Sequence, residues 1–189
     1  MQNTVRPTLP MTADAFFAWA QTLPDGERYE LYDGKPVKMP SERARHALCK
    51  LDVAFELQRS ALPVSSALTV YPDGMAVQIS DRTVLEPDAI LAERLPDDFN
   101  TVRVQDALVV VEVLSPSTKT YDQRGKLPLY FELPILAHVL IVDSETHTVV
   151  RHTRDGGATT FGRGETMRLD PPGIAVDVSA FFRRVPRGR

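Results

Sequence analysis

The run ALVVVEVL, residues 107–114, constrains the fold more than any other part of the chain. Its β-branched residues predict a strand, and apolar side chains at both odd and even positions predict a sheet that is covered on both faces. One glutamate, Glu112, interrupts the run. A buried carboxylate without a partner is strongly unfavourable or takes up a proton, so an ionised Glu112 requires a cation, a cluster of donors or a metal.

Short segments that are rich in β-branched residues and separated by Pro, Asp, Gly and Ser predict further strands. They are residues 66–71, 75–80, 87–92, 137–143 and 147–153. The dipeptide Asp33-Gly34 favours a tight turn and predicts a hairpin over residues 28–39. The glycines and prolines between residues 155 and 182 are typical of additional hairpins.

Three segments have helical character. Thr12 is an N-cap candidate for a short helix over residues 12–23, and Ser41 is one for a longer helix that Pro63 stops after Leu62. Residues 118–133 are long enough for a crossover helix, although Pro128 predicts that this helix is kinked or starts late. The fold class that follows is α/β, with a central mixed β-sheet flanked by helices and additional β-hairpins.

Length and composition narrow the class of protein. The 189 residues suit a single domain, residues 1–189, with a basic tail at 183–189 that we expect to be flexible. The N-terminus does not resemble a secretory signal, no apolar run reaches the roughly 20 residues of a membrane helix, and Cys49 is the only cysteine, so we expect a cytoplasmic protein. The net charge of −3 means that a nucleic-acid partner must be held by a local patch.

A second carboxylate accompanies Glu112. Asp88 stands at the head of the apolar segment 87–92, where the ends of strands in a covered sheet border a cleft. Two neighbouring strands would then present two carboxylates together. Hard divalent cations such as Mg²⁺ prefer oxygen ligands, and one or two carboxylates with waters and a substrate phosphate complete the shell. The pair therefore predicts a magnesium site.

Several motifs carry a resemblance to a known family. They are Pro87-Asp88, VEVLSPST, YDQRGKLPLY and HVLIVD, together with MTADAFFAW, YELYDG, the histidine of the long helix and GIAVDVSAFF near the C-terminus. With these motifs the chain resembles the Uma-type endonuclease family of the restriction-endonuclease-like PD-(D/E)XK nuclease superfamily. The resemblance spans most of the chain and implies a restriction-endonuclease-like fold.

The resemblance also implies roles for individual residues. Asp88 corresponds to the motif aspartate and Glu112 to the motif acid, and both are expected to bind Mg²⁺, with Mn²⁺ as a substitute. The lysine of the superfamily would fall at Leu114, which cannot donate; the family uses the lysine of the following helix, here Lys126. A lysine packed back toward the carboxylates could orient a water and offset charge on the phosphorane.

Two further residues are candidates by resemblance. Glu30 in YELYDG matches another acidic position of the family and could hold a second metal or a water. Since it flanks a hairpin turn, a solvent-facing role is the plain alternative. His46 is a supporting candidate that could hydrogen-bond near the site, and a structural or exposed histidine is the alternative there.

Plain alternatives exist for the other three residues as well. Asp88 follows Pro87 and could only cap a turn. Glu112 could belong to a structural ion pair with Lys126 or Arg124. Lys126 could only balance acids on a solvated helix, which is the usual environment of a surface lysine.

The leading hypothesis is a Mg²⁺-dependent endonuclease that hydrolyses DNA phosphodiester bonds. Paired nicks in duplex DNA need two active sites, so a homodimer is expected. A nonenzymatic module on the same fold, which binds nucleic acid or a protein, stays open because the net charge is negative and Leu114 replaces the superfamily lysine. A glycoside hydrolase that uses Asp88 and Glu112 as acid and base is the third hypothesis.

Overall fold

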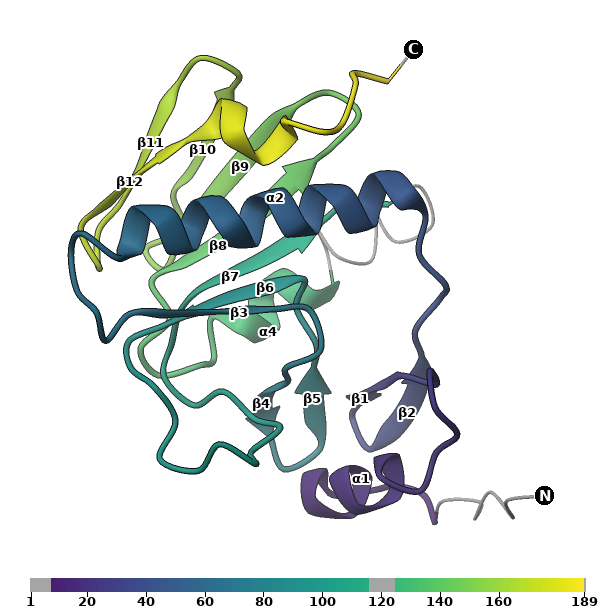
Figure 1. The fold of residues 1–189 in the computed structure, drawn as a ribbon. Helices are drawn as coiled ribbons and strands as arrows, with labels where there is room; N and C mark the ends of the chain where they lie inside the picture. Colours follow the sequence, from purple (N-terminus) through teal and green to yellow (C-terminus); the bar gives the residue numbers. More distant parts are fainter. Residues whose placement is uncertain (1–7, 116–124, 189) are drawn as a thin grey trace.

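The computed structural model describes residues 8–115 and 125–188, and Figure 1 shows its architecture. The helical elements are α1 (Ala13–Ala20), α2 (Ala44–Ala61), α4 (Leu127–Tyr130) and the 3-10 helix η2 (Val178–Phe182). The strands are β1 (Tyr29–Tyr32), β2 (Lys35–Lys38), β3 (Thr69–Pro72), β4 (Val77–Ser80), β5 (Thr83–Leu85), β6 (Ala89–Ala92), β7 (Ala107–Val113), β8 (His138–Asp143), β9 (Thr148–Thr153), β10 (Ala158–Gly162), β11 (Thr166–Leu169) and β12 (Ile174–Asp177). Helices and strands are mixed along the chain, as predicted.

A six-stranded mixed sheet forms the centre, in the order β10-β9-β8-β7-β6-β3. Strands β7 and β8 are parallel, and every other neighbouring pair in this sheet is antiparallel. A four-stranded sheet, β2-β1-β5-β4, and the hairpin β11-β12 are smaller and antiparallel. The predicted central mixed sheet and the additional hairpins are confirmed, whereas β5 had no counterpart among the predicted strands.

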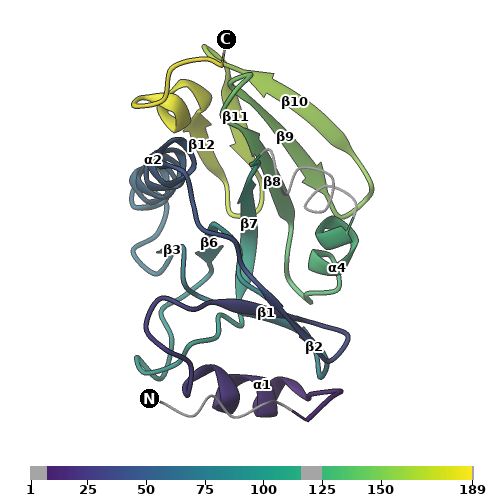
Figure 2. The ribbon, with the colours of Figure 1, turned by 90° about the vertical axis from the view of Figure 1, so that its right-hand side faces the viewer.

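Strand β7 is buried along its whole length, as the run ALVVVEVL predicts. Figure 2 shows α2 on one side of the central sheet and α4 on the other. On the α2 side Val109 and Val111 pack with Val53 and Leu57 of the helix. On the other side Val110 packs with residues that follow the crossover. The two layers exclude water from both faces of β7, so Glu112 lies inside the protein.

The long helix begins later than the sequence predicts. Its N-cap is Arg43, which makes no side-chain capping bond, and α2 runs from Ala44 to Ala61. The prediction that Ser41 caps the helix is therefore wrong. The reason is that residues 41–43 cross from the small sheet to the helix and line a cavity instead. The predicted end is confirmed, since Leu62 is the C-cap and Pro63 follows it.

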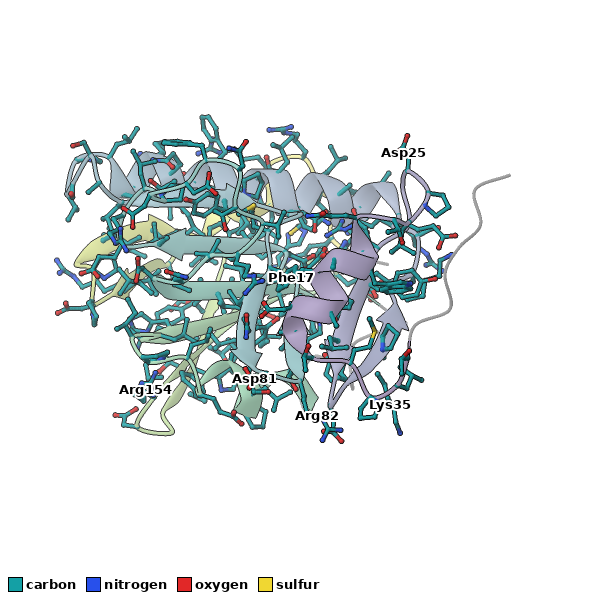
Figure 3. All side chains as sticks on the ribbon, turned by 90° about the horizontal axis from the view of Figure 1, so that it is seen from below. Phe17, Asp25, Lys35, Asp81, Arg82 and Arg154 are labelled. Carbon is teal, nitrogen blue, oxygen red and sulfur yellow. The ribbon has the colours of Figure 1, made fainter. Side chains whose placement is uncertain are left out.

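Other local predictions are confirmed. Thr12 caps α1, because its hydroxyl accepts a bond of 3.3 Å from the backbone N–H of Ala15. Asp33 and Gly34 have positive φ angles of 43° and 77° in the β1–β2 hairpin, the conformation that a tight primed turn requires. Figure 3 views the molecule from below, with α1 lying across the small sheet and Phe17 labelled. The guanidinium of Arg103 stands 4.2 Å from the Phe17 ring centroid.

The crossover between the parallel strands β7 and β8 ends in α4. Of the predicted helix over 118–133, residues 118–124 lie outside the described residues. The described part is helical from Gly125 to Tyr130, with a π-helical start at residues 125–126 and α4 over Leu127–Tyr130. Pro128 lies in the first turn of α4, where no backbone N–H is needed.

No described helix has both the length and the apolar composition needed to cross a lipid bilayer.

The C-terminal segment contacts the body of the protein. Val185 is 3% exposed, and the backbone N–H of Gly188 donates to the carbonyl of Glu145 at 2.9 Å. The guanidinium of Arg45 donates to the carbonyls of Ser144 and Pro186. These contacts bring the basic segment beside the N-terminal end of α2; its predicted flexibility stays a prediction.

Candidate active site

The candidate site lies where β6 begins and β7 ends. These strands are antiparallel, with Ala89 opposite Val111, so the residue before β6 lies level with the last residues of β7. The backbone N–H of Asp88 donates to Val111, and a carboxylate oxygen of Asp88 accepts the N–H of Val113 at 2.6 Å. Register alone thus brings Asp88 beside the strand that carries Glu112, as the sequence predicts.

One cluster of side chains, which we call the α4 group, contains Glu30, Glu112, Lys126 and Tyr130. The ammonium of Lys126 lies between two carboxylates, 2.9 Å from Glu30 Oε1 and 3.1 Å from Glu112 Oε1. The Tyr130 hydroxyl also donates to Glu112 Oε1. Glu30, Glu112 and Lys126 are each at most 5% exposed and Tyr130 is fully buried. The α4 group is therefore a buried cluster of mutually bound charges and donors.

A second cluster, the α2 group, contains Glu42, His46, Lys50 and Asp88. Its members from α2 lie four residues apart, which places them on one side of the helix. His46 Nε2 lies 2.7 Å from the carbonyl oxygen of Val113 and 3.4 Å from Asp88 Oδ2. The ammonium of Lys50 lies 3.6 Å from Asp88 Oδ1 and also pairs with Glu42. The group is more open than the α4 group, because Glu42 is exposed and His46 is half-buried.

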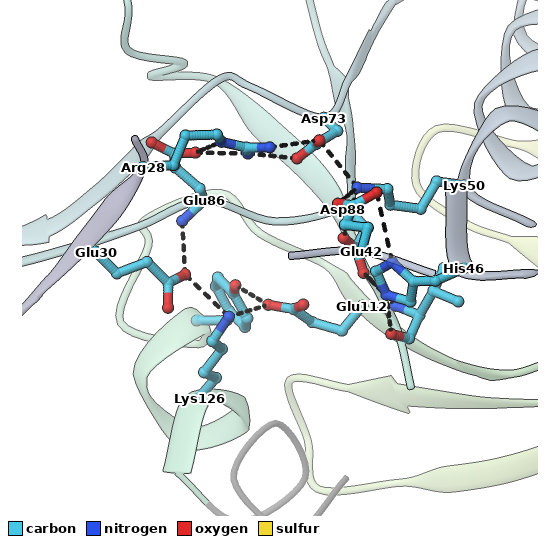
Figure 4. A network of polar contacts seen from close by, with 12 residues as sticks. Arg28, Glu30, Glu42, His46, Lys50, Asp73, Glu86, Asp88, Glu112 and Lys126 are labelled. Atoms are coloured by element: carbon cyan, nitrogen blue, oxygen red, sulfur yellow. Dashed lines mark hydrogen bonds and ion pairs between the residues drawn. The ribbon is translucent and has the colours of Figure 1, made fainter. Parts of the chain in front are cut away.

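Arg28 connects the two groups, as Figure 4 shows. Its guanidinium binds the carboxylates of Asp73 and Glu86. Asp73 in turn accepts a bond of 2.9 Å from Lys50, and the backbone N–H of Glu86 donates to Glu30 at 2.9 Å. Strand β1, which carries Glu30, is thereby tied to the end of the central sheet.

A cavity of about 180 Å³ opens between the groups. Glu42, His46 and Asp88 line it from the α2 group, and Glu112 and Lys126 line it from the α4 group. The site is therefore a single hollow with a carboxylate on each wall.

Among the residues that the structure describes, carboxylates outnumber cations in this network. Six acids, Glu30, Glu42, Asp73, Glu86, Asp88 and Glu112, face three permanently charged bases, Arg28, Lys50 and Lys126. Protonation of His46 would add only one positive charge. A region this poorly solvated favours extra positive charge, because unpaired buried carboxylates are costly.

The pKa values differ between the two groups. Burial raises the pKa of Glu30, and the neighbouring Lys126 offsets only part of that effect. Burial and the nearby carboxylate of Glu112 raise the pKa of Tyr130 well above its ordinary value, so its hydroxyl stays protonated and donates. Around the α2 group the opposite holds: burial disfavours the Asp73 anion, but Arg28 and Lys50 outweigh it and lower the pKa of Asp73 to about 2.

The pKa values of His46 and Lys50 are shifted by the same neighbouring acid, Asp88. Burial disfavours the charged form of each and is the largest single effect, but the neighbouring acceptors together outweigh it, so both pKa values are raised. These acceptors are Asp88 and the Val113 carbonyl for His46, and Asp88, Glu42 and Asp73 for Lys50. The Nδ1 atom of His46 is buried without a hydrogen-bond partner among the described residues, 3.9 Å from Glu42 Oε2. In the tautomer whose Nε2–H donates to Val113, this atom presents a lone pair to a cation.

One set of described residues has the geometry of a metal site. Glu42, His46 and Asp88 each offer a ligand atom, and these atoms all lie within 4.8 Å of one another. The three donors are two carboxylates and one imidazole, which suit a divalent cation. Asp88 was predicted as a ligand and His46 as a supporting residue, whereas Glu42 was not predicted.

All five predicted site residues line the cavity or contact a residue that does. The structure pairs Glu112 with Lys126, so the ion pair proposed as the plain alternative is present; the other proposed pair residue, Arg124, lies outside the described residues. Sequence analysis missed Tyr130 and Lys50. Each lies four residues after a predicted site residue, and this helical spacing could have indicated both. No sequence signal indicated Asp73, which belongs to a loop.

The comparison with protein families decides the family. Residues 13–179 match the model of the family described as "Uma2: Putative restriction endonuclease".

The chain belongs to the Uma2 family.

The matched region of this Uma2 protein includes every residue of the α2 and α4 groups. A relative from Synechocystis sp., "Uncharacterized protein slr1290", is 23% identical over 181 residues, which cover 94% of each chain. A solved structure, described as a putative nuclease belonging to DUF820 from Anabaena variabilis, matches with a TM-score of 0.73 at 16% identity. The match covers 92% of this chain and 98% of that chain, so the two proteins share the fold.

Proposed function

We propose that this Uma2 protein is a divalent-metal-dependent endonuclease that hydrolyses DNA phosphodiester bonds on a restriction-endonuclease-like fold. The observation that carries the proposal is the cavity at the end of β7. Acids outnumber bases among the described residues that line it, and the buried Lys126 of its lining lies between Glu30 and Glu112. Phosphodiester hydrolysis needs these elements, namely a place for a cation and a fixed positive charge near the reacting phosphate.

The residues around the cavity fit Mg²⁺ or Mn²⁺. Asp88 and Glu112 supply carboxylates from the two walls, and Glu42 and His46 add donors beside Asp88. A bound divalent cation would lower the pKa of a water molecule and withdraw charge from a phosphate. The imidazole of His46 suits Mn²⁺ better than Mg²⁺, since transition metals accept nitrogen ligands more readily. Mn²⁺ is therefore the first ion to test.

Lys126 supplies the fixed positive charge. Glu30 and Glu112 hold its ammonium, and the Tyr130 hydroxyl donates to the same oxygen of Glu112. A lysine fixed by two carboxylates has little freedom to rotate, so its ammonium is oriented before a substrate arrives. In this position it can orient the attacking water and offset negative charge that develops on the phosphorane.

DNA is the proposed substrate, and the mouth of the cavity offers contacts for its backbone. Arg43 is exposed at the mouth, and Arg45 also lines the cavity. Arg45 binds the carbonyls of Ser144 and Pro186, which fixes its position. We propose that Arg43 makes the first contact with a phosphate, because an exposed arginine can bind phosphate with two parallel hydrogen bonds.

Nicking of supercoiled plasmid DNA tests the proposal. We expect the wild type to convert supercoiled to open circular DNA with Mn²⁺ or Mg²⁺, and to lose this activity in chelator. Glu112→Ala should be inactive with an unchanged circular-dichroism spectrum. Cleavage by Glu112→Ala, or cleavage in chelator, would contradict the proposal. Binding of DNA in chelator without nicking under any metal condition would favour the nonenzymatic module.

A further inference from the structure

Lys50 has an unusual set of partners for a lysine on a surface helix. Its ammonium pairs with Glu42 Oε1, lies 2.9 Å from Asp73 Oδ2 and lies 3.6 Å from Asp88 Oδ1. Lys50 is only 6% exposed, although lysines are almost never fully buried unless they are paired. The three acids come from the stretch before α2, the turn after β3 and the residue before β6. Three carboxylates from separate segments therefore converge on one buried positive charge.

Two of these carboxylates are held in place by bonds that do not involve Lys50. The guanidinium of Arg28 binds both oxygens of Asp73, at 2.6 Å and 2.5 Å. Asp88 Oδ2 accepts the backbone N–H of Val113 at 2.6 Å. Carboxylate oxygens in a fixed arrangement are the ligands that a hard divalent cation prefers. The position of the Lys50 ammonium therefore has the ligands of a cation site.

Glu42 and Asp88 also face a second position. Glu42 Oε2 lies 3.9 Å from His46 Nδ1, and Asp88 Oδ2 lies 3.4 Å from His46 Nε2. Each carboxylate thus directs one oxygen to Lys50 and the other to His46, and Figure 4 shows the two acids between these bases. Carboxylates that serve two cation positions in this way can hold ions about 3.5–4 Å apart, as in two-metal sites.

The charge of the network limits how many ions it favours. With its six acids ionised and His46 neutral, the described network has three more negative charges than positive ones. One divalent cation would leave one negative charge, whereas a second would make the network positive. Without Lys50 the surplus would be four negative charges, which two divalent cations match. A poorly solvated network favours the state with the least uncompensated charge.

We propose that Lys50 fills the position of a second cation, so that the site binds a single divalent ion on the His46 side of Glu42 and Asp88. This inference rests on the proposed function, because it takes a divalent cation as the resident ion. Lys50 is then a positioning residue, since it neutralises and orients two metal-binding carboxylates. An ammonium offers no coordination site for water or phosphate, so the chemistry that a divalent cation supplies stays at one position.

A lysine holds the corresponding position in the α4 group. The ammonium of Lys126 lies between Glu30 Oε1 and Glu112 Oε1, at 2.9 Å and 3.1 Å. The second metal that the family resemblance implies at Glu30 would have to displace this ammonium. Each wall of the cavity thus carries a fixed positive charge between carboxylates, and one divalent ion is enough to complete the network.

The number of bound Mn²⁺ ions tests the inference, measured by calorimetry and by electron paramagnetic resonance on the same samples. We expect one Mn²⁺ per wild-type chain, with the spectrum of an isolated ion. Lys50→Ala removes the ammonium and keeps the three carboxylates, so it should bind two Mn²⁺ per chain, with a spectrum broadened by the neighbouring ion. Lys35→Ala is the matched control, because Lys35 is an exposed lysine of β2, and it should bind one ion.

A second variant guards against a loss of fold, because Lys50→Ala leaves buried carboxylates without their ammonium. Lys50→Gln keeps an N–H donor for Asp73, removes the charge and adds an oxygen ligand, so we expect two Mn²⁺ per chain here as well. Circular dichroism with and without Mn²⁺ checks the fold of each variant. If neither variant folds without the ion, Mn²⁺ should restore the fold, since the inference requires that a divalent cation can replace the ammonium.

The inference is overturned if the wild type binds two Mn²⁺ or none, if neither Lys50 variant binds a second ion, or if Mn²⁺ does not restore the fold of two unfolded variants. Plasmid nicking is measured separately and distinguishes this failure from failure of the proposed function. One bound ion without nicking under any metal condition would contradict the nuclease and support the inference. Metal-dependent nicking with two bound ions on the wild type would do the reverse.

Discussion

The α2 group and the α4 group contain the same kinds of residue, yet they differ in enclosure. In the α4 group the Lys126 ammonium and the Tyr130 hydroxyl both donate to one oxygen of Glu112. The second carboxylate, that of Glu30, accepts the backbone N–H of Glu86. In the α2 group Glu42 is exposed, and the buried Nδ1 atom of His46 has no hydrogen-bond partner among the residues described. The donors and acceptors of the α4 group thus bind one another without a ligand. The α2 group, on the opposite wall of the cavity, retains atoms that can bind one.

This difference suggests a division of roles. A closed cluster holds its members in one geometry, which suits the placement of the Lys126 charge. An open cluster with a surplus of acids suits the binding of a cation. The following predictions, in order of decreasing expected effect, test whether the two walls differ in this way.

Loss of the Asp88 carboxylate should have the largest effect. We expect Asp88→Asn to abolish Mn²⁺ binding in calorimetry and to reduce cleavage by more than the roughly 100-fold typical for residues that only support a metal ligand. Glu112→Gln should weaken Mn²⁺ binding less than Asp88→Asn, because Lys126 and Tyr130 already occupy one oxygen of Glu112. Equal losses in the two variants would show that the walls contribute equally to the metal site.

Removal of the Lys126 charge should separate cleavage from metal binding. We expect Lys126→Met to lose nearly all cleavage while it binds Mn²⁺ at least as tightly as the wild type. The reason is that Glu30 and Glu112 lose the ammonium that neutralises them, so the cavity becomes more negative. Calorimetry and plasmid nicking on the same preparation give both quantities. A parallel loss of Mn²⁺ affinity and cleavage would contradict the assigned role.

Removal of the Tyr130 hydroxyl should have a moderate effect. Tyr130→Phe keeps the ring in the core but leaves Glu112 with one donor fewer. We expect cleavage to fall by about 10-fold, which corresponds to roughly 1.4 kcal/mol, with Mn²⁺ affinity nearly unchanged. Phe131→Leu in the same segment is the control for packing alone and should retain cleavage. Wild-type cleavage by Tyr130→Phe would show that Lys126 alone orients Glu112.

The slope of stability against pH should have opposite signs for Asp73, which lies beside the α2 group, and Glu30, which belongs to the α4 group. The lowered pKa of Asp73 means that its stabilising contribution is full above its unfolded pKa and is lost as the pH falls through about 2. Asp73→Asn should therefore cost at most about 2 kcal/mol near neutral pH and progressively less in acid.

Glu30 should behave in the opposite way. Its pKa is raised by burial, so the protonated form is favoured in the folded state and ionisation at higher pH reduces stability. Relative to the wild type, Glu30→Gln should gain stability as the pH rises from about 4 to about 7. Urea unfolding measures the two slopes, between about pH 2 and pH 4 for Asp73→Asn and between about pH 4 and pH 7 for Glu30→Gln. Slopes of the same sign would show that the acids near the α2 group and the α4 group do not differ in this way.

Much of the fold could be predicted from local patterns. The β-branched run at 107–114, the Asp33-Gly34 turn and the Thr12 cap each depend on a few neighbouring residues, and the structure confirms all three. The start of α2 could not be predicted from Ser41, because the helix begins only after Arg43 and residues 41–43 line the cavity instead of forming a capping turn. The strand β5 is only three residues long, which gives a period-two pattern too little length to be recognised.

The sequence by itself determined that a glutamate is buried in a central strand and that an aspartate heads the neighbouring one. These conclusions need only burial and strand pairing, which local hydrophobic patterns encode. Only the tertiary structure decided which cations and donors meet each acid. Lys126 pairs with Glu30 across 96 positions of sequence, and Arg28 joins Asp73 to Glu86 through side chains from three separate segments. Such contacts depend on how sheets and helices pack, and packing brings together residues that share no local pattern.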